Sequence, residues 1–256
     1  MFFDSHAHLD DEQFDQDREE VLRRLPEEGV SLFMDIGADL PSSRKAVELA
    51  QKYPYIYAAV GVHPHDAEEM TQADFEEIRE LAQSKRVKAI GEIGLDYYYE
   101  NSRREEQKKW FACQMELSQE LNLPFVIHDR DAHRDCLEIL RRFDLKKTGG
   151  VMHCYSGSAE MAKEIIRMGM VISIAGPVTF KNAVKTVEAV REIPLEYLLI
   201  ETDSPYLAPV PHRGARNTPD NVRFTAEKIA EIKGVSLEEV ARITMDNAKK
   251  VFRIEE

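Results

Sequence analysis

Short apolar runs alternate with longer charged stretches along the chain. The short runs are rich in β-branched and aromatic residues, which favours β-strands. Eight such runs lie at residues 1–4, 31–36, 56–62, 87–93, 124–127, 150–153, 170–174 and 197–200. Each run is followed by a segment long enough for a helix, so the pattern predicts a repeating strand–helix unit.

The longer segments carry apolar residues at helical spacing. In residues 103–121 the apolar positions recur every three or four residues among charged ones, which predicts a helix that packs one face. These positions are Trp110, Cys113, Leu117 and Leu121. After the last strand, Thr218-Pro219 predicts a capped helix start, and the spacing of Ser236 and Glu239 predicts a capping box at a second helix.

Eight strands, each followed by a helix, fit an α/β fold of the (β/α)8 TIM-barrel type with an extra C-terminal helix. A chain of 256 residues is an ordinary length for one such barrel, so we expect a single domain over residues 1–256. A doubly wound open sheet is the rival fold, because strand–helix alternation alone does not distinguish the two.

Composition and charge limit the cell compartment and the partners that we expect for the protein. The three cysteines, Cys113, Cys136 and Cys154, are odd in number and lack CxxC spacing, which argues against disulfides and a thiolate zinc site. No run approaches the about 20 apolar residues of a membrane span. We therefore expect a cytoplasmic monomer with no membrane partner. The net charge of −13 argues against general polyanion binding, so local groups or bound metal must attract any nucleic acid.

Polar side chains follow most of the predicted strands. In a barrel of this type the carboxyl ends of the strands form one face, where active sites are built. Strand alternation also places His6 and His8 on the same side of the first strand. A lone histidine at such a place is more often a structural group, but six metal-ligating side chains at one face favour a metal site. They are His6, His8, Glu92, His128, His153 and Asp203.

The types of donor indicate the chemistry. Imidazole and carboxylate without thiolate suit zinc, manganese or iron, whereas carboxylate and water suit magnesium. Six donors exceed the three or four that one catalytic zinc takes, so we expect two divalent ions that share a bridging carboxylate. Two ions about 3.5 to 4 Å apart favour hydrolysis of an ester, above all a phosphoester.

Several segments resemble, in order, the TatD family of metal-dependent deoxyribonucleases of the amidohydrolase superfamily. They are SHAHLD, VGVHPH, GEIGLDYYY, the HDR after PFVI, HCYSG, and ETDSPYLAP with a downstream RNTP, within residues 4–252. The resemblance implies a TIM barrel that cleaves DNA, with RNA as an alternative, from the 3′ end of single strands. DNA repair is a setting that such an activity serves.

The resemblance also implies a role for each donor. His6, His8 and Asp203 would bind one ion, His128 and His153 the other, and Glu92 would bridge them. The ions would be Mg²⁺ or Mn²⁺, with Zn²⁺ as the alternative. We expect the ions to activate a water molecule and Asp203 to orient it and accept its proton, so Asp203 and Glu92 are the predicted catalytic residues.

Further residues are predicted to contact the substrate or support the ligands. They are His63, His65, Asp96, Arg130, Tyr155, Ser156, Lys181 and Arg216. For His63 and His65 we favour these roles over direct ligation, because Pro64 between them suits a strand exit better than a regular strand. Glu201 shares strand parity with Asp203 and has either a structural pairing or a role in the site. Parity points Cys154 toward the helices, where it would have no chemistry.

Two other functions stay open. An amide or ester hydrolase, such as an enzyme that removes an aminoacyl group from tRNA, could use the same fold and metals. A non-catalytic protein could keep the metals for structure. The convergence of carboxylates, histidines and loop cations on one mouth disfavours the second of these.

Overall fold

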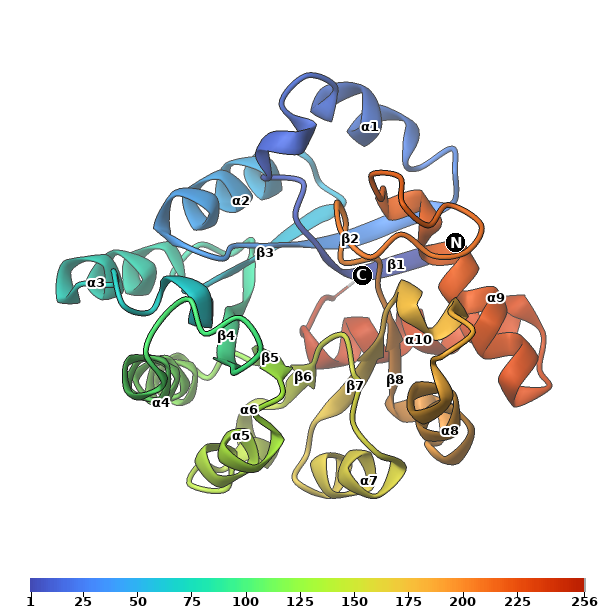
Figure 1. Cartoon of the computed structure of the whole chain (residues 1–256). Helices are drawn as coiled ribbons and strands as arrows, with labels where there is room; N and C mark the ends of the chain where they lie inside the picture. The colour runs from blue at the N-terminus through green and yellow to red at the C-terminus, as the bar shows by residue number, and fades with distance from the viewer. Residues whose placement is uncertain (256) are drawn as a thin grey trace.

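The eight predicted strands form one parallel sheet that curves into a barrel (Figure 1). The structure is a computed structural model that describes residues 1–255. Each strand pairs with its neighbour in sequence, from β1 to β8. The strands are β1 (Phe2–Ala7), β2 (Val30–Ile36), β3 (Ile56–Val60), β4 (Val87–Asp96), β5 (Phe125–Arg130), β6 (Gly150–Met152), β7 (Val171–Ile174) and β8 (Leu198–Ile200).

The first and last strands meet just beyond the end of β8. Ala7 and Ser204 form a parallel bridge, and the Asp203 N–H donates to the His6 carbonyl oxygen at 2.9 Å. This contact closes the barrel and excludes the open doubly wound sheet. It also brings the end of β1, with its histidines, beside Asp203.

Helices form the outer layer around the strands (Figure 1). They are α1 (Arg18–Arg24), α2 (Leu40–Lys52), α3 (Gln72–Leu81), α4 (Arg104–Leu121), α5 (His133–Leu140), α6 (Leu145–Thr148), α7 (Ala159–Arg167), α8 (Val184–Glu192), α9 (Val222–Lys233) and α10 (Leu237–Val251). Among the described residues, none of these helices is both long and apolar enough to cross a membrane.

Helix α4 confirms the predicted helix, but its buried face differs from the predicted stripe. Cys113 and Leu121 are only partly buried, whereas Gln107 and Gln114 are buried. The Gln114 side chain accepts from the Val62 N–H at 2.7 Å and donates to the Val62 carbonyl at 3.1 Å. A polar residue on this face therefore pairs with backbone groups just beyond β3, which an apolar pattern does not predict.

The two predicted starts of the C-terminal helices have different outcomes. The Ser236 hydroxyl accepts from the Glu239 N–H at 3.1 Å, which confirms the N-cap of α10. Among the described residues the Glu239 side chain makes no return bond to the Ser236 N–H, so the capping box is only half formed. The side chain of Thr218 makes no capping bond, and a 3₁₀ turn, Pro219–Asn221, comes before α9. Pro219 therefore begins this short turn and not the α-helix itself.

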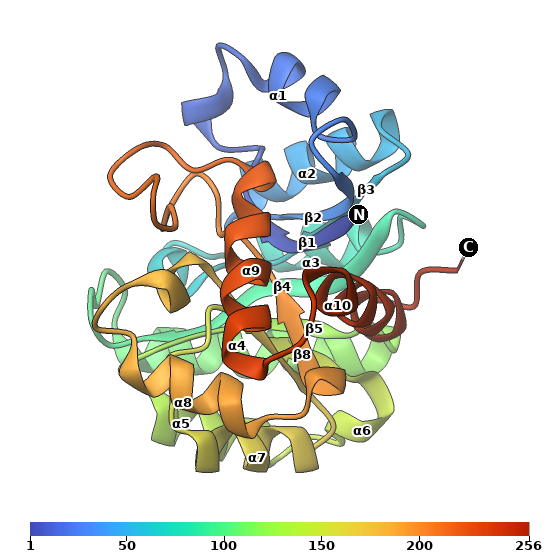
Figure 2. The same cartoon turned by 90° about the vertical axis from the view of Figure 1, so that its right-hand side faces the viewer.

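Helix α10 and the residues after it cover the amino-terminal end of the barrel. Phe252 is fully buried and its ring centroid lies 6.1 Å from that of Phe3, among inward-facing strand residues such as Met34 and Val126. In Figure 2, α10 and the orange segment after β8 lie on opposite sides of the strands. One end of the barrel is thus sealed by packing, and the other is left for a site.

Candidate metal centre

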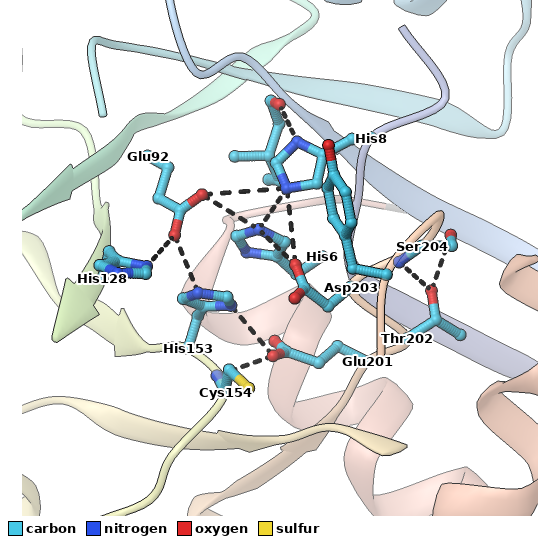
Figure 3. Close-up of polar contacts among 12 residues, drawn as sticks. His6, His8, Glu92, His128, His153, Cys154, Glu201, Thr202, Asp203 and Ser204 are labelled. Atoms are coloured by element: carbon cyan, nitrogen blue, oxygen red, sulfur yellow. Dashed lines mark hydrogen bonds and ion pairs between the residues drawn. The ribbon is translucent and has the colours of Figure 1, made fainter. Parts of the chain in front are cut away.

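A cavity of about 850 Å³ opens at the carboxyl ends of the strands. Five of the six predicted ligands line it, namely His8, Glu92, His128, His153 and Asp203. His6, the sixth, is fully buried at the end of β1. Figure 3 shows all six side chains pointing toward one another, although they come from both ends of the sequence.

Glu92 lies between two groups of histidines (Figure 3). Its Oε1 is 2.8 Å from His153 Nε2 and 2.9 Å from His128 Nδ1. Its Oε2 is 3.5 Å from His6 Nε2 and 3.8 Å from His8 Nε2. Each carboxylate oxygen therefore faces a separate pair of imidazoles.

Asp203 completes the group around His6 and His8. Its Oδ1 lies 3.5 Å from His8 Nε2 and 3.6 Å from His6 Nε2. The backbone of Asp203 is left-handed, with φ of 57°, a conformation that aspartate tolerates better than most residues. Its side chain is 13% exposed, compared with 4% for Glu92, so Asp203 is the more accessible of the two carboxylates.

The arrangement of His6 and His8 fits a cation. His8 Nδ1 lies 2.7 Å from the Ile36 carbonyl oxygen, which can only accept, so Nδ1 carries a proton and Nε2 is the nitrogen that a metal would take in exchange for any proton there. That Nε2 is 3.1 Å from His6 Nε2. With the oxygens of Glu92 and Asp203 beside them, two ring nitrogens and two carboxylates converge on one place. A divalent ion would satisfy all of these acceptors together.

Carboxylates orient two of the other rings from outside the cluster. His153 Nδ1 lies 3.1 Å from Glu201 Oε1, and His128 Nε2 lies 3.0 Å from Asp96 Oδ2. Metal-binding histidines usually donate their second N–H to such a group, which fixes the tautomer and makes the first nitrogen a better ligand. Both rings therefore turn their remaining nitrogen toward Glu92.

The electrostatics of the cluster favour positive charge among the carboxylates. Burial alone would raise the pKa of Glu92, but His153 and His6 outweigh it and hold that pKa well below its usual value. Burial likewise opposes the charged form of His8, yet its hydrogen bond to Asp203 and the nearby carboxylates raise its pKa to about 10. The carboxylates stay ionised and attract cations.

Among residues 1–255, three sets of side chains bring potential ligand atoms within 4.8 Å of one another. They are His6, His8 and Asp203; His6, His153 and Glu201; and His63, Glu92 and His128. The first set is the one that the family resemblance implies. The other two add His63 and Glu201 as candidate donors, although the sequence favoured a supporting role for His63.

Strand alternation left the role of Glu201 open and predicted the wrong direction for the Cys154 side chain. Glu201 accepts from the Cys154 N–H at 2.7 Å as well as contacting His153, so its pairing supports the site directly. Cys154 lines the cavity and does not point toward the helices. That prediction was wrong because β6 ends at Met152 and Cys154 has a left-handed φ of 41°, so strand parity no longer applies.

The predicted supporting residues divide into two groups. Those that line the cavity are His63, His65, Arg130, Tyr155 and Ser156. Asp96 is fully buried behind His65 and His128 and contacts both. Lys181 and Arg216 do not line the cavity within the described part of the chain. Arg216 instead binds the Asp17 carboxylate at 2.5 Å, because the acidic segment before α1 lies beside it.

A closed (β/α)8 barrel with imidazoles and carboxylates gathered at the carboxyl ends of its strands is typical of metal-dependent hydrolases. The sequence model of the family described as TatD related DNase matches residues 3–253. The chain therefore belongs to the TatD family, and it is a metal-dependent hydrolase of that family.

Individual relatives agree with this assignment. The chain is 49% identical over 254 residues to the uncharacterized metal-dependent hydrolase YabD of Bacillus subtilis. The alignment covers 99% of this chain and 100% of YabD. It is 40% identical over 255 residues to the uncharacterized metal-dependent hydrolase YcfH of Escherichia coli K12, covering 98% and 96%. The crystal structure of YjjV, a TatD homolog of E. coli K12, matches with a TM-score of 0.93 at 29% identity, covering 99% and 98%.

Proposed function

We propose that the protein is a metal-dependent phosphodiesterase that hydrolyses nucleic acid through two divalent ions. The position of Glu92 carries this proposal, because its two oxygens face two separate pairs of imidazoles. A carboxylate so placed suits a bridge between two ions, and two-ion sites are suited to displacement at phosphorus.

The family resemblance implies which residues would hold the ions. His6, His8 and Asp203, whose ligand atoms lie within 4.8 Å of one another, would hold one ion. His128 and His153 would hold the other, with Glu92 Oε1 2.9 and 2.8 Å from their ring nitrogens and with His63 and Glu201 within reach. Bound there, Mg²⁺, Mn²⁺ or Zn²⁺ would lower the pKa of water and neutralise charge on phosphate oxygens.

We assign the proton transfer to Asp203. It is the more exposed of the two carboxylates, it lines the cavity, and its pKa is lowered because its bond to His8 and the nearby histidines outweigh burial. An ionised carboxylate at this position would orient a water molecule and take its proton as the phosphoester is attacked.

The substrate we propose is the 3′ end of single-stranded DNA, with RNA as the alternative, cleaved in the 3′-to-5′ direction. The description of the family as TatD related DNase supports a DNA substrate. The cavity, at about 850 Å³, lies within the range of about 300–1,000 Å³ usual for small-ligand sites, which suits a strand end.

The test is digestion of end-labelled oligonucleotides after removal and return of metal. We expect cleavage of single strands with Mg²⁺ or Mn²⁺, with products that shorten from the 3′ end. Glu92→Gln and Asp203→Asn should each lower kcat at least about a hundredfold with an unchanged circular dichroism spectrum. Glu196→Gln, an exposed carboxylate just before β8, is the matched control and should keep full activity.

Two outcomes would contradict the proposal. One is full nuclease activity in both site variants. The other is hydrolysis of acylated substrates, such as aminoacyl-tRNA, by metal-loaded protein that leaves every oligonucleotide intact. The second result would favour the amide or ester hydrolase.

A further inference from the structure

Exposed side chains with apolar surface gather at the rim of the cavity. Tyr98 and Tyr99, in the loop between β4 and α4, are 59% and 54% exposed. Tyr206 and Leu207, in the segment after β8, are 48% and 40% exposed. Tyr99, Tyr206 and Leu207 line the cavity itself. Exposed apolar surface grouped on loops around a pocket is typical of a binding site.

Arg130 lies against both tyrosines of the β4–α4 loop. Its guanidinium carbon is 4.1 Å from the ring centroid of Tyr98 and 4.6 Å from that of Tyr99. The two rings are nearly perpendicular, at 88°, with centroids 4.9 Å apart. Within the described residues Arg130 forms no ion pair with a carboxylate, and its side chain lines the cavity beside the two tyrosines. Its charge is therefore available to a ligand.

The Asp96 carboxylate contacts both the β4–α4 loop and the histidines of the metal centre. Asp96 Oδ1 accepts from the backbone N–H groups of Tyr98 and Tyr99, each at 2.9 Å. Its Oδ2 contacts His128 Nε2 at 3.0 Å and His65 Nε2 at 2.9 Å. The loop backbone is thus anchored directly beside a predicted metal ligand, so a group resting on the tyrosines would lie close to the reacting phosphate.

Tyr206 forms a wall on the side of His8. Its hydroxyl donates to Asp11 Oδ2 at 2.7 Å, and its ring centroid lies 6.2 Å from that of His8. This hydrogen bond fixes the ring in place before any ligand arrives. The cavity is therefore lined by aromatic groups from two separate loops.

We propose that Tyr98, Tyr99 and Arg130 form a nucleobase-binding site that holds an unpaired base of the substrate beside the metal centre. Proteins that bind single strands without sequence preference stack bases on aromatic side chains and arginine. This inference rests on the proposed function, and it adds the part of the substrate that is recognised.

The charge of the protein makes such a site useful. With a net charge of −13, the protein gains little from general attraction to phosphates. Stacking needs no net positive charge, and every base offers a face for it. Bases within a duplex are already stacked on one another, so the site selects unpaired bases.

The test compares two single-stranded oligonucleotides of equal length, one with normal bases and one with abasic residues at its 3′ end. Both contain the same phosphodiester linkages. We expect the wild-type protein to cleave both, with KM at least about fivefold higher for the abasic strand. The double variant Tyr98→Ala/Tyr99→Ala should raise KM for the normal strand by a similar factor with kcat unchanged, and leave KM for the abasic strand unaltered.

Two controls separate stacking from structure. Tyr98→Phe/Tyr99→Phe keeps both rings and should keep the wild-type KM. Tyr197→Ala removes a tyrosine that is 40% exposed but lies just before β8, at the other end of the barrel, and should change nothing. Equal KM values for the two strands in the wild type, or no change in the alanine double variant, would overturn the base site alone. Cleavage of neither strand would overturn the proposed function and the base site with it.

Discussion

Replacing Asp96 by asparagine tests how the metal centre is held together. Asp96 Oδ1 serves two backbone N–H groups of the next loop, and an amide oxygen can do the same. Its Oδ2 faces His128 Nε2 at 3.0 Å, and there asparagine would place an NH₂ group. An NH₂ group donates only, so His128 would have to carry its proton on Nδ1. That proton would point toward Glu92, where a lone pair is needed for a metal.

The expected loss of metal affinity in Asp96→Asn follows from the hydrogen-bond partner that His128 loses. Loss of an outer partner of a metal-bound histidine typically weakens metal binding about 10- to 100-fold, or about 1.4–2.7 kcal/mol. Because Asp96→Asn favours the wrong tautomer in addition to removing a charge, we expect the upper part of this range. The effect should fall on the ion at His128 and His153, not on the ion at His6 and His8.

The assay is calorimetric titration of metal-free protein with Mn²⁺, with Asp135→Asn as the matched control. Asp135 also accepts from a tyrosine, Tyr97, at 2.8 Å and pairs with Lys108, but has no contact with the cluster. We expect one weakened binding step in Asp96→Asn and none in Asp135→Asn. Two unchanged binding steps in Asp96→Asn would refute the tautomer argument.

Three further predictions concern protons, metal and packing. The carboxylates raise the pKa of His8, His128 and His153 against the effect of burial, so protons compete with metal, and the apparent metal Kd should rise as the pH falls from about 8 to about 6. Because these pKa values are raised, the protonated histidines stabilise the metal-free fold at low pH, and this stabilisation is lost as the pH rises through the raised values, about 10 for His8. The increase in Tm on adding metal should therefore be largest at high pH. A Kd that does not change with pH would contradict this prediction. Each of the two ions, at about 100 times its Kd, should add about 2.7 kcal/mol to the free energy of unfolding, or about 5–10 °C in Tm by calorimetry. An unchanged Tm would mean that the ions do not bind the folded state preferentially. Phe252→Ala should destabilise the fold by about 3–5 kcal/mol in urea titrations and leave metal affinity intact, because Phe252 packs at the opposite end of the barrel; lost metal affinity with unchanged stability would count against this division.

The fold could be predicted from sequence because local pattern and global arrangement agree. Each strand appears as an apolar run, and barrel closure then makes the strand ends neighbours. Strand parity also brought His6 and His8 together correctly, since both lie at or beside the end of a regular strand. These inferences need only the alternation of side chains and the geometry of parallel strands.

Parity failed where the strand had already ended. Cys154 follows β6 in a left-handed conformation and therefore faces the cavity. The polar residues Gln107 and Gln114 could not be predicted as buried, because their partners are backbone groups at or just beyond the strand ends. A periodic pattern records hydrophobicity and contains no information on such partners.

The arginines of the predicted loops show a second limit of prediction from the sequence. Arg130 and Arg216 both follow a strand predicted from the sequence, and nothing in the sequence separates their roles. Arg216 is paired with Asp17 from a distant segment, whereas Arg130 rests on two tyrosines at the rim. Which cation reaches the cavity depends on tertiary neighbours that a single sequence does not reveal.

Anomalous diffraction from crystals loaded with Mn²⁺ tests the central claim most directly. The account predicts two ions about 3.5–4 Å apart, one on each side of the Glu92 carboxylate, with His6, His8 and Asp203 on one ion and His128 and His153 on the other. A single ion, or two ions that do not share Glu92, would contradict it.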